Sequence, residues 1–118
     1  GAGLHLEDQK FPKRCGHLDG KELVSLDHMV EKVEWARKAS DAVTPGGRGR
    51  GDFVICARTD AKGVEGFDAA VTRAKAYVAA GADMIFPEGL TSDEEFKKFA
   101  DAILSVSSGT YLLANMTE

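Results

Sequence analysis

The run Lys13-Arg14-Cys15-Gly16-His17 places one thiol among two cations and an imidazole. Nearby positive charge lowers the pKa of a cysteine thiol from its usual value of about 8.5. A cysteine in this setting can give up or accept a proton near neutral pH, which an inert buried cysteine cannot do. Gly16 permits backbone angles that other residues avoid, so the run is predicted to lie in a loop. Taken alone, it is equally compatible with a solvated turn that happens to contain cysteine.

Other residues that could do chemistry follow directly after four short apolar segments of the chain. Carboxylates in such positions suit an oxygen-liganded cation such as Mg²⁺. An arginine there would present a rigid fork to a substrate carboxylate, although Arg58 could instead form an ion pair with Asp60 or Glu88. Amide and hydroxyl groups could bind a second carboxylate or a hydroxyl. The candidates are Glu7, Asp8, Arg58, Asp60, Glu88, Asn115 and Thr117.

These candidates need strands and helices to position them. The apolar segments predict strands at residues 3–6, 53–57, 84–86 and 111–114. Between the strands, apolar residues recur at helical spacing, which predicts helices over residues 27–42, 66–80 and 92–104. Gly81 is a plausible stop for the second helix. Ser92 and Glu95 have the spacing of a capping box at the start of the third helix.

Alternation of strands and helices predicts an α/β fold with parallel strands joined by right-handed crossovers. Both a doubly wound sheet and a (β/α)₈ barrel have this pattern. No glycine-rich phosphate loop follows any strand, and the candidate residues follow the strands, where barrels hold their chemistry. The barrel is therefore favoured. A complete barrel needs about 250 residues and eight strands, so the 118 residues are expected to form one partial domain, about half of a barrel.

Composition narrows the class of protein further. The net charge of −4 gives no electrostatic reason to expect nucleic acid as a partner. No apolar run approaches the ~18 residues that cross a membrane, and no signal peptide opens the chain. The two cysteines stand in different contexts, which favours reduced thiols in a cytosol-like compartment. Cys56 is expected in the core, as are His5 and Trp35. The chain enters a strand at once and stops after one, so we expect an internal segment of a longer barrel.

The five-residue cysteine run resembles the signature of the isocitrate lyase and 2-methylisocitrate lyase superfamily, which also includes phosphoenolpyruvate mutase. Four further segments are similar to the ends of that family's fourth, fifth, sixth and seventh barrel strands, in the right order. The versions in residues 86–88 and 115–118 resemble the 2-methylisocitrate lyase branch more closely. The four segments are residues 3–9, 57–61, 81–88 and 113–118.

The resemblance implies a Mg²⁺-dependent retro-aldol cleavage of 2-methylisocitrate, a small tricarboxylate, to pyruvate and succinate in propionate catabolism. Cys15 matches the acid that protonates the succinate carbanion, with Lys13, Arg14 and His17 beside it. Glu7 matches an acidic group that meets the metal through water, while the family's direct aspartate ligands lie upstream of residue 1. The resemblance also implies a homotetramer in the cytoplasm, or in mitochondria if the source is eukaryotic. The residues matching substrate contacts are Cys15, Gly16, Arg58, Glu88, Asn115, Met116 and Thr117.

Three alternatives remain open at this point. Isocitrate lyase differs by one substrate methyl, and a pocket discriminates a methylene by only ~1–3 kcal/mol. The chain could also be an inactive half-barrel or an interaction module, whose unpaired strand edges would need a partner. A cysteine hydrolase would need a histidine base beside its thiol, and His17 is only two residues from Cys15 in a loop, which is poor geometry for that role.

Overall fold

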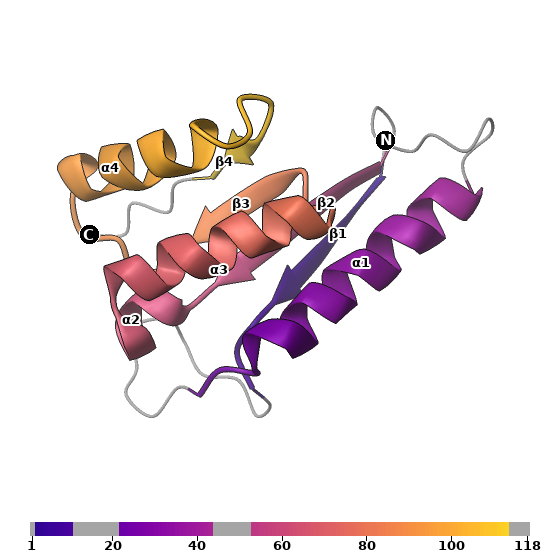
Figure 1. Cartoon of the computed structure of the whole chain (residues 1–118), viewed down its shortest axis with the longest axis horizontal. Helices are drawn as coiled ribbons and strands as arrows, with labels where there is room; N and C mark the ends of the chain where they lie inside the picture. Colours follow the sequence, from indigo (N-terminus) through magenta and orange to yellow (C-terminus); the bar gives the residue numbers. More distant parts are fainter. Residues whose placement is uncertain (1, 11–21, 44–52, 114–118) are drawn as a thin grey trace.

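A computed structural model describes residues 2–10, 22–43 and 53–113 of the chain. Within these ranges, one sheet contains four parallel strands whose spatial order follows their sequence order, β1-β2-β3-β4. Each strand therefore crosses over to its immediate neighbour, as expected of a barrel segment (Figure 1). The strands are β1 (Ala2–Glu7), β2 (Phe53–Thr59), β3 (Met84–Pro87) and β4 (Tyr111–Leu112).

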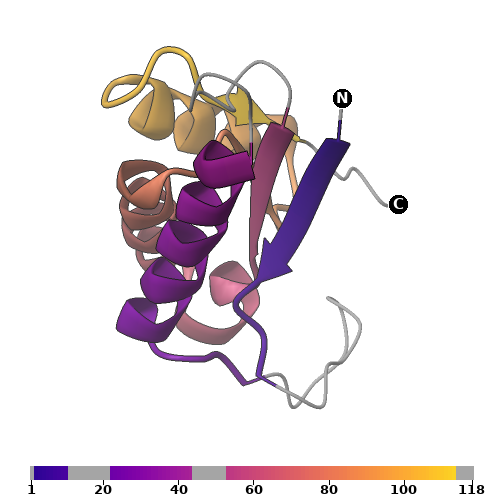
Figure 2. The same ribbon diagram turned by 90° about the vertical axis from the view of Figure 1, so that its right-hand side faces the viewer.

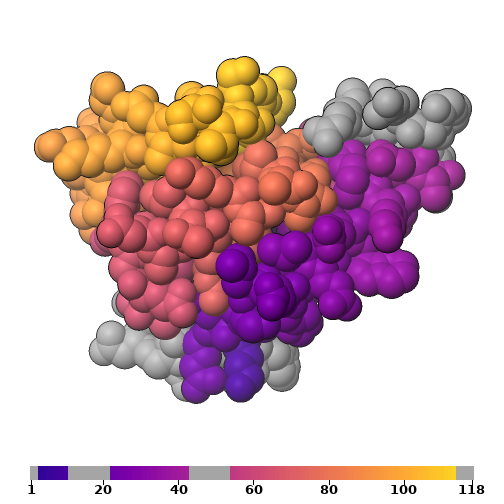
Figure 3. Space-filling view, viewed as in Figure 1, coloured from indigo at the N-terminus to yellow at the C-terminus, as the bar shows by residue number. Residues whose placement is uncertain are grey.

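The three predicted helices are confirmed, and a fourth, short helix was not predicted. The predicted ones are α1 (Leu26–Val43), α3 (Phe67–Ala80) and α4 (Asp93–Leu104). The addition is α2 (Ala61–Glu65), which directly follows β2. All of them lie on one face of the sheet (Figure 2). Seen from the helical side, α1, α3 and α4 pack next to one another into one continuous surface (Figure 3).

The strand register decides which side chains face the helices. Ile55, Ala57 and Ile85 alternate with half-buried neighbours and have no exposed surface, so they belong to the face that the helices cover. The opposite face of the sheet has no helix over it among the described residues. Tyr111 is 66 % exposed there, and its register partner Met84 shares that face. In a barrel this open face is the interior, so the α/β half-barrel predicted from the sequence is confirmed.

The core lies between the sheet and the helices. Helical stripes predicted from the sequence supply its inner residues, including Met29 and Val33 of α1, Tyr77 of α3, and Phe99 and Ile103 of α4, all with no exposed surface. The rings of Phe67 and Phe99 meet edge to face with centroids 6.3 Å apart, which joins α3 to α4. The helices are thus held by apolar burial, the dominant favourable term in folding.

Three expectations about core residues are wrong. Trp35 is 66 % exposed on the outer side of α1, where the ammonium of Lys38 lies over the indole, 5.9 Å from its ring centroid. His5 and Cys56 are register partners on the open face of the sheet; His5 is exposed and Cys56 is half-buried. Partial burial raises the pKa of the Cys56 thiol. Both residues point away from the helices because their strand positions alternate with those of the core.

Two predicted helix ends are confirmed. Gly81 ends α3 with φ of +125°, and a Cβ there would lie 2.9 Å from the side chain of Arg37, so both its conformation and its surroundings require glycine. The Ser92 hydroxyl accepts a hydrogen bond from the amide of Glu95 at 3.1 Å. The Glu95 carboxylate in turn accepts from the amide of Thr91, at 2.9 Å. The capping box is therefore present, shifted by one residue on its return bond.

A buried ion pair lies at the edge where β2 and β3 begin, which we call the N-terminal edge of the sheet. The Nη2 group of Arg37 in α1 donates to the carboxylate of Asp83. The same carboxylate accepts from the amide of Ile55 at 3.0 Å, and Nε of Arg37 donates to the carbonyl of Gly81 at 3.1 Å. This cluster, Arg37, Ile55, Gly81 and Asp83, fastens α1 and the end of α3 to the sheet.

Candidate functional site

The structure brings three of the sequence-predicted site residues together at the edge where β1, β2 and β3 end, the C-terminal edge. Glu7 and Arg58 are register partners that face the open side of the sheet. Glu88 follows β3, and its amide donates to the carbonyl of Thr59 at 3.0 Å. Two further candidates, Asp8 and Asp60, are also described, and both are buried. The remaining predicted site residues lie outside the described residues; they are Lys13, Arg14, Cys15, Gly16, His17, Asn115, Met116 and Thr117.

Arg58 is held as a fork by one carboxylate. Its Nε and Nη2 atoms donate to the two oxygens of Asp60 at 3.1 and 3.0 Å, and Nε lies 3.8 Å from a carboxylate oxygen of Glu7. The ion pair with Asp60, an alternative left open by the sequence, is therefore present. Nη1 takes part in neither hydrogen bond to Asp60. Pairing with Asp60 therefore leaves the Nη1 edge of the guanidinium for a second carboxylate.

The surroundings of Arg58 keep it charged and aligned. Burial alone lowers the pKa of the guanidinium, but the hydrogen bond and charge of Asp60, with the charges of Glu88 and Glu7, raise that pKa above its usual value. The guanidinium carbon also lies 5.5 Å from the ring centroid of Phe86 on the adjacent strand, a cation–π contact. Arg58 is thus a permanent cation in a fixed orientation at the C-terminal edge.

Asp8, grouped with Glu7 by the sequence, instead faces the helical side and is fully buried. Its two carboxylate oxygens accept from the Thr59 hydroxyl at 2.7 Å and from the amide of Asp60 at 2.9 Å. The hydroxyl of Tyr77 donates to it at 2.7 Å, and Nη1 of Arg73 lies 3.6 Å away. We call Asp8, Thr59, Arg73 and Tyr77 the Asp8 cluster.

Arg73 and Tyr77 of α3 are polar residues of the site region that the sequence did not reveal. Arg73 donates from Nη1 to the Tyr77 hydroxyl at 3.2 Å and to the carbonyl of Val24 at 2.9 Å. Burial raises the pKa of the Tyr77 hydroxyl, as do the charge and hydrogen bond of Asp8, against the opposing effect of Arg73. Tyr77 therefore remains a hydrogen-bond donor to Asp8. Both residues stand on the inward face of α3, where the apolar stripe marks Tyr77 as core and gives no sign of Arg73.

Both ends of the segment that carries Cys15 are attached to the C-terminal edge. Gln9 and Leu23 form an isolated antiparallel bridge immediately after β1. The amide of Lys10 donates to the carbonyl of Glu22 at 2.6 Å, and the amide of Val24 donates to the carbonyl of Asp8 at 2.8 Å. The described residues on either side of that segment, 9–10 and 22–24, therefore lie next to Asp8 at the end of β1.

The described residues do not form a metal site by themselves. Within residues 2–10, 22–43 and 53–113, no group of three or more His, Cys, Asp or Glu side chains could hold a metal ion. Glu7 is the described residue that matches an acidic neighbour of Mg²⁺, and it lies beside the cation of Arg58. The expectation that Glu7 meets a metal through water stays a prediction.

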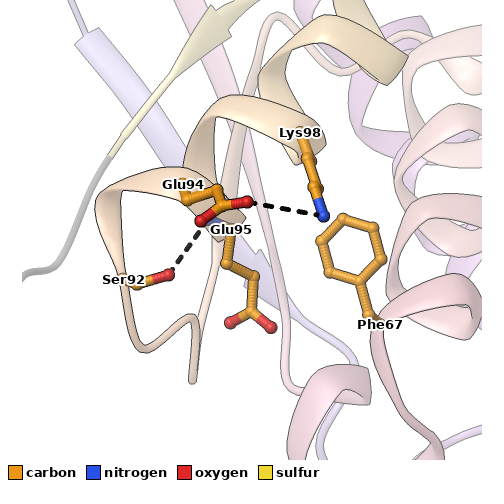
Figure 4. A pocket seen from close by; sticks show the side chains of 5 residues that line it. All are labelled: Phe67, Ser92, Glu94, Glu95 and Lys98. Carbon is orange, nitrogen blue, oxygen red and sulfur yellow. Dashed lines mark hydrogen bonds and ion pairs between the residues drawn. The ribbon is translucent and has the colours of Figure 1, made fainter.

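Two surface pockets lie near the strand ends. One, of about 540 Å³, is lined by Gln9, Lys10, Leu23, Val24, Ser25, His28 and Lys32. The other, of about 330 Å³, is lined by Phe67, Ser92, Glu94, Glu95 and Lys98 (Figure 4). In the second pocket Lys98 pairs with Glu94 at 3.8 Å. This pocket lies within the helical layer. Neither pocket includes Arg58.

In the described ranges, no helix is both long enough and apolar enough to cross a membrane.

Comparison with known proteins identifies the class of protein that this fold and site define. Residues 1–116 match the family model of phosphoenolpyruvate phosphomutase. The chain therefore belongs to this family, within the isocitrate lyase/PEP mutase superfamily. The resemblance that the sequence motifs indicated is confirmed.

Individual relatives narrow the comparison. The chain is 57% identical over 117 residues to "Probable 2-methylisocitrate lyase 1" of Corynebacterium glutamicum, covering 99% of this chain and 34% of the relative. It is 52% identical over 117 residues to 2-methylisocitrate lyase of Aeropyrum pernix, covering 99% and 33%. The chain thus spans about a third of the length of these relatives.

Solved structures agree with this placement. A 2,3-dimethylmalate lyase structure has a TM-score of 0.75 at 38% identity, covering 98% of this chain and 35% of that one. An oxaloacetate acetylhydrolase structure has a TM-score of 0.73 at 34% identity, covering 96% and 38%. A phosphonopyruvate hydrolase complex with oxalate and Mg²⁺ has a TM-score of 0.58 at 25% identity, covering 96% and 44%.

Proposed function

We propose that this chain is the central segment of a carbon–carbon lyase that cleaves 2-methylisocitrate to pyruvate and succinate. The observation that carries the proposal is the fork of Arg58, fixed at the C-terminal edge by Asp60 and flanked by Glu7. A rigid, permanently charged fork is the group that recognises a carboxylate in two-point geometry. High identity to proteins named 2-methylisocitrate lyase supports the particular substrate.

In this proposal Arg58 binds one carboxylate of the tricarboxylate and fixes its orientation on the open face of the sheet. Cys15 supplies the proton that ends the reaction at the succinate carbon, and Lys13, Arg14 and His17 adjust its proton affinity. The bridge between Gln9 and Leu23 supports this role, because it begins and ends the segment of Cys15 beside Glu7. The remaining substrate contacts come from Gly16, Glu88, Asn115, Met116 and Thr117.

Mg²⁺ belongs to the proposal as a ligand of the complete protein. When bound, it would act as a Lewis acid and stabilise negative charge on the cleaved fragment. Glu7 would face it through water, while the direct aspartate ligands would come from chain preceding residue 1. A cytoplasmic homotetramer acting in propionate catabolism completes the proposal.

The open face of the sheet supports the placement within a larger barrel. Tyr111 is 66 % exposed and Leu113 is 44 % exposed. In the complete protein, the remaining strands would cover this face and close the barrel around the candidate site. The alternative of a free-standing interaction module is tested by expressing residues 1–118 alone, which we expect to be inactive as a lyase.

The test is a pair of assays on the full-length protein that contains this segment, supplied with Mg²⁺ and either 2-methylisocitrate or isocitrate. We expect pyruvate and succinate from the first substrate at a higher kcat/KM than glyoxylate from the second. A preference for isocitrate would replace the substrate, and activity with neither would overturn the proposed reaction.

The role of Cys15 is tested separately with Cys15→Ser. This variant is expected still to bind the substrate in calorimetry and to lose most of its turnover, since a serine hydroxyl is a much weaker acid. Turnover close to that of the unchanged protein would exclude Cys15 as the proton donor.

A further inference from the structure

The turn after β2 uses its side chains in an unusual way. Asp60 occupies the N-cap position of α2, yet its side chain makes no capping hydrogen bond. An aspartate at this position normally accepts from an amide of the first helical turn. Here both of its oxygens are occupied by Arg58. The adjacent Thr59 hydroxyl accepts from the amide of Ala61 instead, at 3.2 Å.

The buried carboxylate of Asp8 holds this turn from the helical side of the sheet. Asp8 accepts from the Thr59 hydroxyl at 2.7 Å and from the amide of Asp60 at 2.9 Å. Its own amide donates to the carbonyl of Arg58 at 3.2 Å. The Thr59 hydroxyl therefore lies between Asp8 and the first amide of α2. These hydrogen bonds hold the backbone before and after Asp60, the residue that pairs with Arg58.

Thr59 cannot meet a substrate on the open face of the sheet. It has no exposed surface and shares the helical face with Ala57, whereas Arg58 points to the opposite face. The carbonyl of Thr59 also accepts the amide of Glu88, so the same residue connects the ends of two strands. Any influence of the Thr59 hydroxyl on a substrate must therefore be indirect, and the hydroxyl itself contacts the turn that carries Asp60.

We propose that Thr59, supported by Asp8, is a positioning residue for the Arg58 fork. Its hydroxyl holds the turn so that the Asp60 carboxylate stays aimed at Arg58 rather than capping α2. The inference rests on the proposed function in one respect, that Arg58 binds a substrate carboxylate. It adds a determinant of substrate affinity that does not touch the substrate.

Thr59→Val tests this role because valine keeps the shape and removes the hydroxyl. The matched control is Tyr77→Phe, which removes another 2.7 Å hydrogen bond from the same Asp8 carboxylate but leaves the turn intact. In the full-length protein with 2-methylisocitrate, we expect Thr59→Val to raise KM about tenfold, the change expected from losing one hydrogen bond. Thr59→Ser is expected to restore KM, and Tyr77→Phe to leave it unchanged.

A purely structural role predicts a different result. Partial unfolding lowers the active fraction, which reduces apparent kcat and leaves KM unchanged. Equal KM values in Thr59→Val and Tyr77→Phe would therefore overturn the inference. If Thr59→Val is insoluble, Thr59→Ala is measured in its place, because it removes the same hydroxyl without putting a methyl group in the hydroxyl's position beside Asp8.

A second readout does not depend on activity. The Nε–H group of Arg58, assigned in ¹⁵N spectra by its loss in Arg58→Lys, reports the hydrogen bond to Asp60. We expect faster solvent exchange of this proton in Thr59→Val and normal exchange in Thr59→Ser. Unchanged exchange in Thr59→Val would contradict the positioning role. If the unchanged protein lacks lyase activity but the exchange pattern is as expected, the proposed function fails while the positioning role stands.

Discussion

The two edges of the sheet each contain an arginine–aspartate pair, but the pairs differ in what they connect. At the N-terminal edge, Arg37 and Asp83 bind each other, a strand amide and a helix-end carbonyl. At the C-terminal edge, Asp8 binds the turn that carries Asp60, and Asp60 in turn holds Arg58. The first network ends in backbone groups, whereas the second ends in a cation on the open face. The N-terminal network thus connects helices to the sheet, whereas the C-terminal network holds Arg58, the proposed carboxylate-binding residue.

The largest expected effect concerns the N-terminal network. Asp83→Ala leaves the buried Arg37 without its buried carboxylate partner and the amide of Ile55 without its acceptor. Breaking a buried pair in this way costs about 3–5 kcal/mol. We expect urea denaturation of the full-length protein to show this loss, with KM unchanged in the fraction that remains folded. A raised KM would mean that the two edges are not separable.

Arg58→Lys is expected to have the next largest effect, on activity. Lysine keeps the charge but cannot pair with a carboxylate through two parallel bonds. We expect kcat/KM for 2-methylisocitrate to fall about 100-fold, equivalent to about 2.7 kcal/mol. Stability should change far less than in Asp83→Ala, because Arg58 is partly exposed. Steady-state kinetics and thermal unfolding of the same samples check both statements.

Tyr77→Phe sharpens the comparison within the C-terminal network. The change removes the donor that α3 supplies to Asp8 and leaves the two donors of the turn in place. An unmet hydrogen-bonding group in a buried site costs about 1–3 kcal/mol. We expect denaturant unfolding to show a loss in the lower part of this range. A loss as large as that of Asp83→Ala would mean that both networks serve mainly as fastenings.

The smallest effects are expected at the rims of the two networks. Glu65 lies 3.3 Å from Arg73 and is 44 % exposed, and Asp41 lies 3.6 Å from Arg37 and is 41 % exposed. Ion pairs near solvent contribute about 0.2–1 kcal/mol. Glu65→Ala and Asp41→Ala should therefore each lower the free energy of unfolding by less than about 1 kcal/mol. A larger loss in either variant would show that the network extends to its rim.

Much of the fold could be predicted because its signals are local. Helical stripes such as Met29 and Val33, and the glycine stop at Gly81, need only a few neighbouring residues to be recognised. The short helix α2 was missed because five residues give no periodic stripe, and Gly63 interrupts them. The exposure of Trp35 was missed because its aromatic side chain was weighed above its position, although at helical spacing it stands off the stripe of Met29 and Val33.

The candidate site was predicted only where its residues follow strands. Glu7, Arg58 and Glu88 were found because parallel strands bring their ends to one edge. Tyr77 and Asp8 are 69 positions apart in the chain, and no local pattern links them. Whether Arg58 pairs with Asp60 or Glu88 could not be decided from the sequence either, since the choice depends on the turn that Asp8 and Thr59 hold.

The bridge between Gln9 and Leu23 has a consequence for how such proteins can diversify. The hydrogen bonds beside it, from Lys10 to Glu22 and from Val24 to Asp8, join backbone groups, so they impose little on the side chains that they enclose. The attachment points at residues 9–10 and 22–24 therefore do not depend on which side chains the intervening residues carry. Under the proposed function, transplanting residues 11–21 between relatives of different specificity would exchange the proposed acid–base groups and leave Glu7 and Arg58 at the C-terminal edge as they are.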